Sequence, residues 1–87
     1  MATIRGTSGA DNLNGTNQAD SMYGYAGNDQ INGNGGDDLI YGGAGADRLY
    51  SGGGQDRLYG EGGNDQLWST GGGSIGMYGG SGADSFC

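Results

Sequence analysis

The chain contains no proline, no histidine and no lysine, and its one cysteine is the last residue, Cys87. The absence of histidine excludes imidazole acid–base catalysis, Ser-His and Cys-His nucleophiles and most zinc sites. A lone cysteine cannot form an intramolecular disulfide, so it says nothing about the redox compartment. Only 32% of the 87 residues are apolar, and no apolar run approaches the roughly 20 residues of a membrane span. We therefore predict no membrane span and no enzyme activity.

Positive charge is also scarce. The chain has ten acidic residues and three arginines, which gives a formal net charge of −7. This balance disfavours nucleic acid or an anionic membrane surface as a partner. It predicts a cation as the natural counterpart.

Glycine is abundant, at 24 of 87 residues, but it has no period of three and no proline accompanies it, so collagen is excluded. Composition alone leaves a disordered glycine-rich segment or a repeat array. The positions of the aspartates favour the array, because seven of them recur at a spacing of nine: Asp11, Asp20, Asp29, Asp38, Asp47, Asp56 and Asp65. The next position in this series holds Ser74, and Asp84 resumes the series one residue late.

The repeat unit reads G-x-x-G-x-D-x-U-x, where U is a large apolar residue. It predicts a six-residue turn followed by a three-residue strand whose central side chain points inward. One apolar residue per unit forms a core only if successive strands face each other, so we expect two repeat units per coil and two stacked parallel sheets. The inward residues would be Ile4, Met22, Ile40, Leu58 and Met77 in one sheet, and Leu13, Ile31, Leu49, Leu67 and Phe86 in the other.

Such stacking would place carboxylates in two ladders along the edges of the coil. One ladder holds Asp11, Asp29, Asp47, Asp65 and Asp84, and the other holds Asp20, Asp38 and Asp56. Carboxylates about 4.8 Å apart repel by roughly 3.5 kcal/mol at an effective dielectric constant near 20. Arg48 and Arg57 fall at strand positions expected to face solvent, so they cannot offset this repulsion. A small hard cation fits, because glycine lets backbone carbonyls approach the same point as the carboxylates.

The unit resembles the calcium-binding nonapeptide of RTX proteins, and the resemblance covers nearly the whole chain as a single array over residues 1–87. It implies an all-β fold, a parallel β-roll (β-solenoid) of two short parallel sheets in which each coil takes two repeats, or about 18 residues. It also implies calcium between turns that are two repeats apart, about five to six ions in all.

In that family, one turn offers its aspartate and the carbonyls at its first and third positions, and the other offers its aspartate and those at its second and fourth. On one edge the resemblance implies three calcium sites. Their ligands would be Gly6, Ser8 and Asp11 with Tyr25, Gly27 and Asp29; Gly24, Ala26 and Asp29 with Gly43, Gly45 and Asp47; and Gly42, Ala44 and Asp47 with Glu61, Gly63 and Asp65. On the opposite edge it implies two calcium sites. Their ligands would be Gly15, Asn17 and Asp20 with Asn34, Gly36 and Asp38; and Gly33, Gly35 and Asp38 with Gly52, Gly54 and Asp56. A sixth site would pair Asp65 with Asp84.

The pattern has three departures. Gln18 replaces the second turn glycine in the Asp20 repeat, and Ser74 removes a carboxylate from the site that it would share with Asp56. A one-residue insertion predicts an irregular loop at about residues 70–76, where the letters T-G-G-G-S also resemble a linker. Asp37 lies off the ladders, and we interpret it as a solvated turn residue.

An aromatic residue often follows the inward one, as at Tyr23, Tyr41, Tyr59 and Tyr78 in one sheet and Tyr50 and Trp68 in the other. This stripe is either a binding platform or a product of cross-strand packing. We favour packing.

We predict a calcium-binding module that is disordered without calcium and folds when it binds the ion. The resemblance implies a secreted, extracellular location and a larger parent protein exported by type I secretion. The alternative is a polysaccharide-binding module similar to those of mannuronan epimerases. Ice binding would need threonines along one edge, and only Thr7 and Thr16 are available on adjacent turns.

Overall fold

A computed structural model describes residues 2–68, 75–80, 82 and 85–86, and these contain strands and no helix. The strands are β1 (Ala2–Arg5), β2 (Asn12–Asn14), β3 (Asp20–Tyr23), β4 (Gln30–Asn32), β5 (Leu39–Tyr41), β6 (Arg48–Tyr50), β7 (Asp56–Tyr59), β8 (Gln66–Trp68), β9 (Ile75–Tyr78) and β10 (Ser85–Phe86). Over this described part of the chain, nothing helical could cross a membrane.

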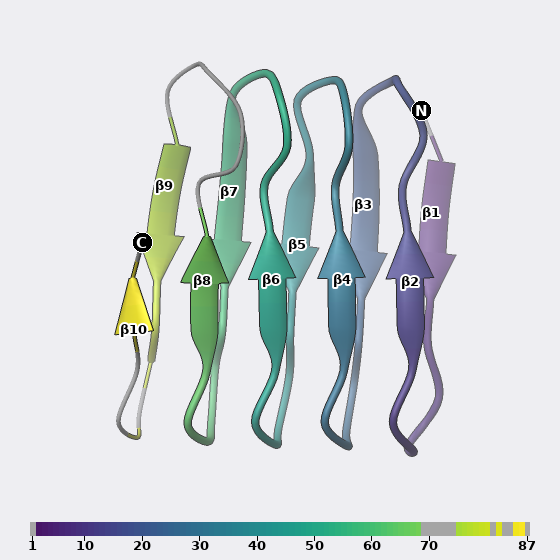
Figure 1. The fold of residues 1–87 in the computed structure, drawn as a ribbon. Coiled ribbons are helices and arrows are strands. Elements are labelled where there is room, and N and C mark those ends of the chain that lie inside the picture. Colours follow the sequence, from purple (N-terminus) through teal and green to yellow (C-terminus); the bar gives the residue numbers. More distant parts are fainter. Residues whose placement is uncertain (1, 69–74, 81, 83–84, 87) are drawn as a thin grey trace.

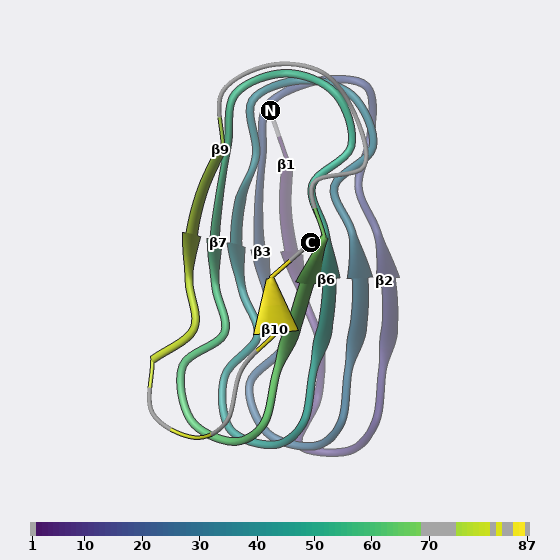
Figure 2. The ribbon, with the colours of Figure 1, turned by 60° about the vertical axis from the view of Figure 1, so that its left-hand side comes forward.

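The strands form two parallel sheets that face each other. One has the order β1-β3-β5-β7-β9, and the other has the order β10-β8-β6-β4-β2. Figure 1 shows the two rows one behind the other, with the chain passing from one sheet to the other at every turn. Seen after a 60° rotation, the coils superpose as a flattened loop (Figure 2). The predicted all-β parallel solenoid is confirmed.

The strand register confirms the predicted alignment of the apolar residues. Ile4 pairs with Met22, Met22 with Ile40, and Ile40 with Leu58, so each apolar residue meets the one two repeats further along the chain. The opposite sheet aligns its apolar residues in the same way, from Leu13 to Ile31, Leu49 and Leu67. Among the described residues, six core side chains are 0% exposed: Met22, Ile31, Ile40, Leu49, Leu58 and Leu67. One buried residue per repeat is a small core for a chain of this length.

The one-residue insertion is absorbed before β9. Leu58 pairs with Met77, and Leu67 pairs with Phe86, so both of these steps are one residue longer than the others. The predicted irregular loop is wrong at its end, because Ile75 and Gly76 already belong to β9. Gly76 pairs with Arg57 at an outward position, which leaves the inward place to Met77. Residues 70–74 of that loop, including Ser74, lie outside the described residues.

The aromatic stripe is packed ring against ring. The rings of Tyr23 and Tyr41 are 5.2 Å apart, and those of Tyr41 and Tyr59 and of Tyr59 and Tyr78 are both 4.9 Å apart. In the other sheet, the rings of Tyr50 and Trp68 stack at 4.7 Å. Because stacked rings cover one another's faces, the packing interpretation is confirmed, and the polysaccharide alternative gains no support.

Candidate metal sites in the turns

The turns gather on two edges of the solenoid. Residues 6–11, 24–29, 42–47 and 60–65 connect the first sheet to the second, and residues 15–20, 33–38 and 51–56 make the return connection (Figure 1). Each turn ends in a ladder aspartate, as the spacing of nine predicts. Burial of these carboxylates is nearly complete from Asp20 to Asp65, with exposed fractions between 1% and 3%.

From Asp29 to Asp65, one oxygen of each ladder carboxylate joins successive coils. The backbone N–H of Asp29 donates to Oδ1 of Asp47 at 2.8 Å, and that of Asp38 donates to Oδ1 of Asp56 at 2.7 Å. The same bond joins Asp11 to Asp29, Asp20 to Asp38 and Asp47 to Asp65. The aspartates thus form the two predicted ladders, held together through Oδ1.

The second oxygen has a different environment. Oδ2 of Asp29, Asp38, Asp47 and Asp56 is buried and meets no hydrogen-bond donor among the described residues. A buried carboxylate oxygen without a donor or cation is strongly unfavourable. A hard cation is the group that such an oxygen, with carbonyls beside it, would bind.

The acid–base properties of these aspartates follow from their burial. Loss of hydration raises the pKa of Asp38 and of Asp47 from the ordinary value of 3.8 to about 7, although a backbone N–H from the preceding coil works in the opposite direction. The nearest ladder carboxylates add to the increase in these pKa values. Burial also raises the pKa of Asp29 and Asp56.

Glycine at the first turn position leaves the space beside Oδ2 free of a side chain. A Cβ on Gly24 would lie 2.6 Å from Oδ2 of Asp29 and 2.6 Å from the carbonyl oxygen of Gly42. At Gly33 the corresponding atoms are Oδ2 of Asp38 and the carbonyl oxygen of Ser51, again at 2.6 Å. A carboxylate and a carbonyl therefore bound a space that a side chain would fill. These oxygens belong to the type of ligand set that calcium prefers.

In the described turns from residue 24 onward, the second and fourth positions have left-handed backbones. The φ angles are 65° at Tyr25, 64° at Asn34 and 68° at Glu61, which is uncommon for residues other than glycine. Gly27 and Gly45, at fourth positions, have φ angles of 91° and 102°. The residues predicted as second and fourth ligands share this geometry: Tyr25, Gly27, Asn34, Gly36, Gly43, Gly45, Gly52, Gly54, Glu61 and Gly63.

The carbonyls at these positions face the following coil. Those of Tyr25 and Gly27 lie against Gly43 and Gly45, and those of Asn34 and Gly36 lie against Gly52 and Gly54 in the same way. The predicted grouping instead directed Tyr25 and Gly27 to the preceding turn. The repeat shows which turns are neighbours, but the peptide orientation in a left-handed turn decides which neighbour a carbonyl faces. The third-position residues Ser8, Asn17, Ala26, Gly35 and Ala44 lie in the expected turns.

The spacing of nine does not reveal a second set of contacts at the fifth turn position. Oδ1 of Asn28 accepts from the N–H of Ala46, and Oδ1 of Asp37 accepts from the N–H of Gln55, both at 2.8 Å. Asp37 is exposed, but it joins two coils and is not simply solvated. The signal that could have identified these contacts is the recurrence of Asn or Asp just before the ladder aspartate.

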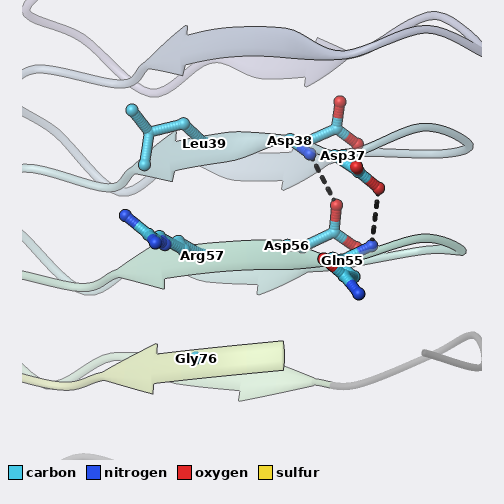
Figure 3. A pocket seen from close by; sticks show the side chains of 7 residues that line it. All are labelled: Asp37, Asp38, Leu39, Gln55, Asp56, Arg57 and Gly76. Carbon is cyan, nitrogen blue, oxygen red and sulfur yellow. Dashed lines mark hydrogen bonds between the residues drawn. The ribbon is translucent and has the colours of Figure 1, made fainter. Parts of the chain in front are cut away.

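The arginines do not fill the role of the cation. A groove of about 560 Å³ runs beside Asp38 and Asp56, and Arg57 contributes to its lining. Figure 3 shows the Arg57 side chain at the opposite end of this groove from the two carboxylates. Arg48 and Arg57 are exposed, as predicted.

Asp11 and Asp20, in the first coil, differ from the later aspartates. Thr7 donates to Asp11 from its backbone N–H and hydroxyl, and Thr16 donates to Asp20 in the same way. Asp84, at the other end of its ladder, lies outside the described residues.

Side chains alone do not complete a site in the described ranges, because no three acidic, histidine or cysteine residues come together there. Backbone carbonyls would have to supply the remaining ligands. A family model for the RTX calcium-binding nonapeptide repeat (4 copies) matches residues 5–40, 32–67 and 41–74. These matches span most of the chain and imply calcium binding. The search of curated proteins found no match.

Proposed function

Because this chain belongs to the family of RTX calcium-binding nonapeptide repeats, we propose that it is a calcium-dependent folding module, not an enzyme. The observation that carries this proposal is the row of buried Oδ2 atoms without a hydrogen-bond donor among the described residues, at Asp29, Asp38, Asp47 and Asp56. Each of these oxygens requires a positive partner to offset its burial.

The ligands would come from two successive coils. Between residues 24–29 and 42–47, the candidates are Oδ2 of Asp29 and the carbonyl oxygens of Tyr25, Gly27 and Gly42. Asp47, one coil further on, completes the pair of carboxylates that the family pattern requires. The same grouping recurs on the other edge, where Asp38 and the carbonyl oxygen of Ser51 lie beside Gly33.

Calcium binding and folding would be coupled. The ligands of each site come from turns that are two repeats apart in the sequence, and they come together only in the coiled state. An ion that binds only the coiled state stabilises it by mass action. With one buried apolar residue per repeat, the core is too small to fold the chain alone, so we propose that the calcium-free chain is largely disordered.

We further propose that this module belongs to a larger protein exported by type I secretion. A chain that folds only in calcium would remain unfolded where calcium is scarce and would fold outside the cell. The proposed affinity is in the range of extracellular calcium modules, with dissociation constants of about 10⁻⁴ to 10⁻³ M.

Circular dichroism during a calcium titration tests the proposal. We expect a disordered spectrum in excess chelator and a β-rich spectrum with calcium, with a midpoint of about 10⁻⁴ to 10⁻³ M. A chain that is already β-rich in chelator would refute the coupling to folding. A chain that stays disordered in about 10 mM calcium, well above the proposed range of about 10⁻³ M, would refute the function.

A further inference from the structure

The turns of the first coil, residues 6–11 and 15–20, have a different hydrogen-bond pattern from those that follow. The N–H of Thr16 donates to Oδ2 of Asp20 at 2.7 Å, and the Thr16 hydroxyl lies 3.0 Å from both carboxylate oxygens. In the other first-coil turn, the N–H of Thr7 donates to Oδ2 of Asp11, and the hydroxyl lies 2.9 Å from Oδ1. Oδ2, the oxygen without a donor at Asp29, therefore has protein donors in both of these turns.

The threonine hydroxyls also contact the backbone within the turn. Oγ1 of Thr7 accepts from the N–H of Gly9 at 3.2 Å, and Oγ1 of Thr16 accepts from the N–H of Gln18 at 3.1 Å. Each hydroxyl therefore bridges the fourth turn position to the ladder carboxylate. A neutral threonine side chain thus occupies the part of the turn where the later coils have backbone carbonyls and an unpartnered carboxylate oxygen.

The backbone changes accordingly. In every described turn from residue 24 onward, the second and fourth positions have left-handed φ angles. In the described first coil, Thr7, Gly9, Thr16 and Gln18 do not. This conformation explains why the fourth position of the second turn accepts Gln18, a residue that departs from the repeat pattern. The second and fourth residues of the first-coil turns thus lack the left-handed backbone of the proposed calcium ligands, although the carbonyls of Gly9 and Gln18 still lie against the following coil.

We infer that the first coil is metal-independent, and that Thr7 and Thr16 satisfy Asp11 and Asp20 in place of calcium. This inference rests on the proposed function, since it concerns which turns of a calcium-binding array take an ion. A carboxylate that already accepts two or more hydrogen bonds is stabilised in its charged form, so it needs a cation less than an unpartnered carboxylate does. Two of the sites implied by the family pattern, Asp11 with Asp29 and Asp20 with Asp38, therefore take no ion. The chain would bind about three to four ions instead of five to six.

Calcium bound per chain at saturation, measured by equilibrium dialysis, tests the inference on the whole chain. Asp20→Asn and Asp38→Asn form a matched pair, because the two aspartates occupy the same position in adjacent turns of one ladder. We expect Asp38→Asn to lose at least one ion and Asp20→Asn to lose none. Circular dichroism in saturating calcium verifies that both variants are folded.

A second pair of variants tests the role of the hydroxyl. The double substitution Thr16→Gly/Gln18→Gly gives this turn the glycines found at Gly43 and Gly45, and we expect it to gain one ion. Thr16→Ser keeps both the hydroxyl and the N–H, so its ion count should equal that of the unmodified chain.

Three results would overturn the inference. It fails if folded Asp20→Asn loses an ion, or if the double glycine variant folds and gains none. In both cases the remaining calcium binding would leave the proposed function intact. A chain that binds no calcium would instead refute the proposed function, and the inference with it.

Discussion

The backbone N–H of Asp20 donates to Oδ1 of Asp38, 2.9 Å away and one full coil further along the chain. Asp38 in turn donates its own N–H to Oδ1 of Asp56. In the later coils, Oδ1 of the ladder carboxylate therefore connects the coils, while Oδ2 lies beside the first residue of its own turn, as at Gly24 and Gly33. The ladder aspartates combine a structural role and a proposed metal-binding role in a single side chain.

This division of roles predicts different effects for two adjacent carboxylates. Asp38→Asn removes a proposed ligand charge and should raise the calcium midpoint by about tenfold or more, or about 1.4 kcal/mol. Asp37→Asn removes the same charge but keeps the oxygen that accepts from Gln55. Its calcium midpoint should stay within about threefold, because its side chain is exposed to solvent. Equal shifts in the two calcium titrations would contradict the assignment of Asp38 as a ligand.

The glycines of the turns should also differ in their tolerance of a side chain. Gly45 has a φ angle of 102°, and a Cβ there would collide with the carbonyl oxygen of Gly27. We expect Gly45→Ala to raise the calcium midpoint by about tenfold or more, because alanine in a left-handed conformation alone costs about 1–2 kcal/mol. A Cβ on Gly53 meets nothing within 4 Å, so Gly53→Ala is the matched control. A comparable increase for Gly53→Ala would contradict the assignment of the Gly45→Ala effect to the Gly27 carbonyl, because the loss of glycine from the unfolded chain would by itself favour folding.

The spacing of nine was sufficient to predict the solenoid, its register and its core, because side chains alternate on a strand and only one packing buries Ile31, Ile40 and Leu49 together. The same spacing predicts which aspartates are neighbours. It could not predict which coil the Tyr25 carbonyl faces, since that depends on a left-handed φ angle at a residue other than glycine. Nor could it predict the threonine bridges, because the spacing places Thr16 and Asp20 in one turn but does not show that the threonine hydroxyl and N–H reach the carboxylate.

Magnesium should substitute poorly for calcium. The candidate ligands beside Gly24 and Gly33 are carboxylate and carbonyl oxygens at positions set by the backbone. Magnesium requires tighter octahedral geometry and retains its water molecules. We expect folding, measured by circular dichroism, to need at least about tenfold more magnesium than calcium. Equal midpoints would show that the turns do not form water-poor calcium sites.

The raised pKa values predict that acid favours the metal-free fold. Asp38 and Asp47 have pKa values of about 7 when folded and 3.8 ordinarily, so the folded chain binds more protons than the unfolded chain between these limits. Their protonation therefore contributes stability that is fully present below pH 3.8 and is lost as the pH rises through about 7. Circular dichroism of dialysed, metal-free protein should show more β-structure near pH 5 than near pH 8.

The double variant Asp38→Asn/Asp47→Asn is the control for this effect. It cannot take up the two protons, so the pH dependence of its metal-free β-structure should be flatter. Asp37→Asn should change the pH dependence much less than the double variant does, because Asp37 is exposed and its charge is the smallest of the causes that raise the pKa of Asp38. More β-structure at pH 8 than at pH 5 in the metal-free unmodified chain would contradict the raised pKa values of Asp38 and Asp47.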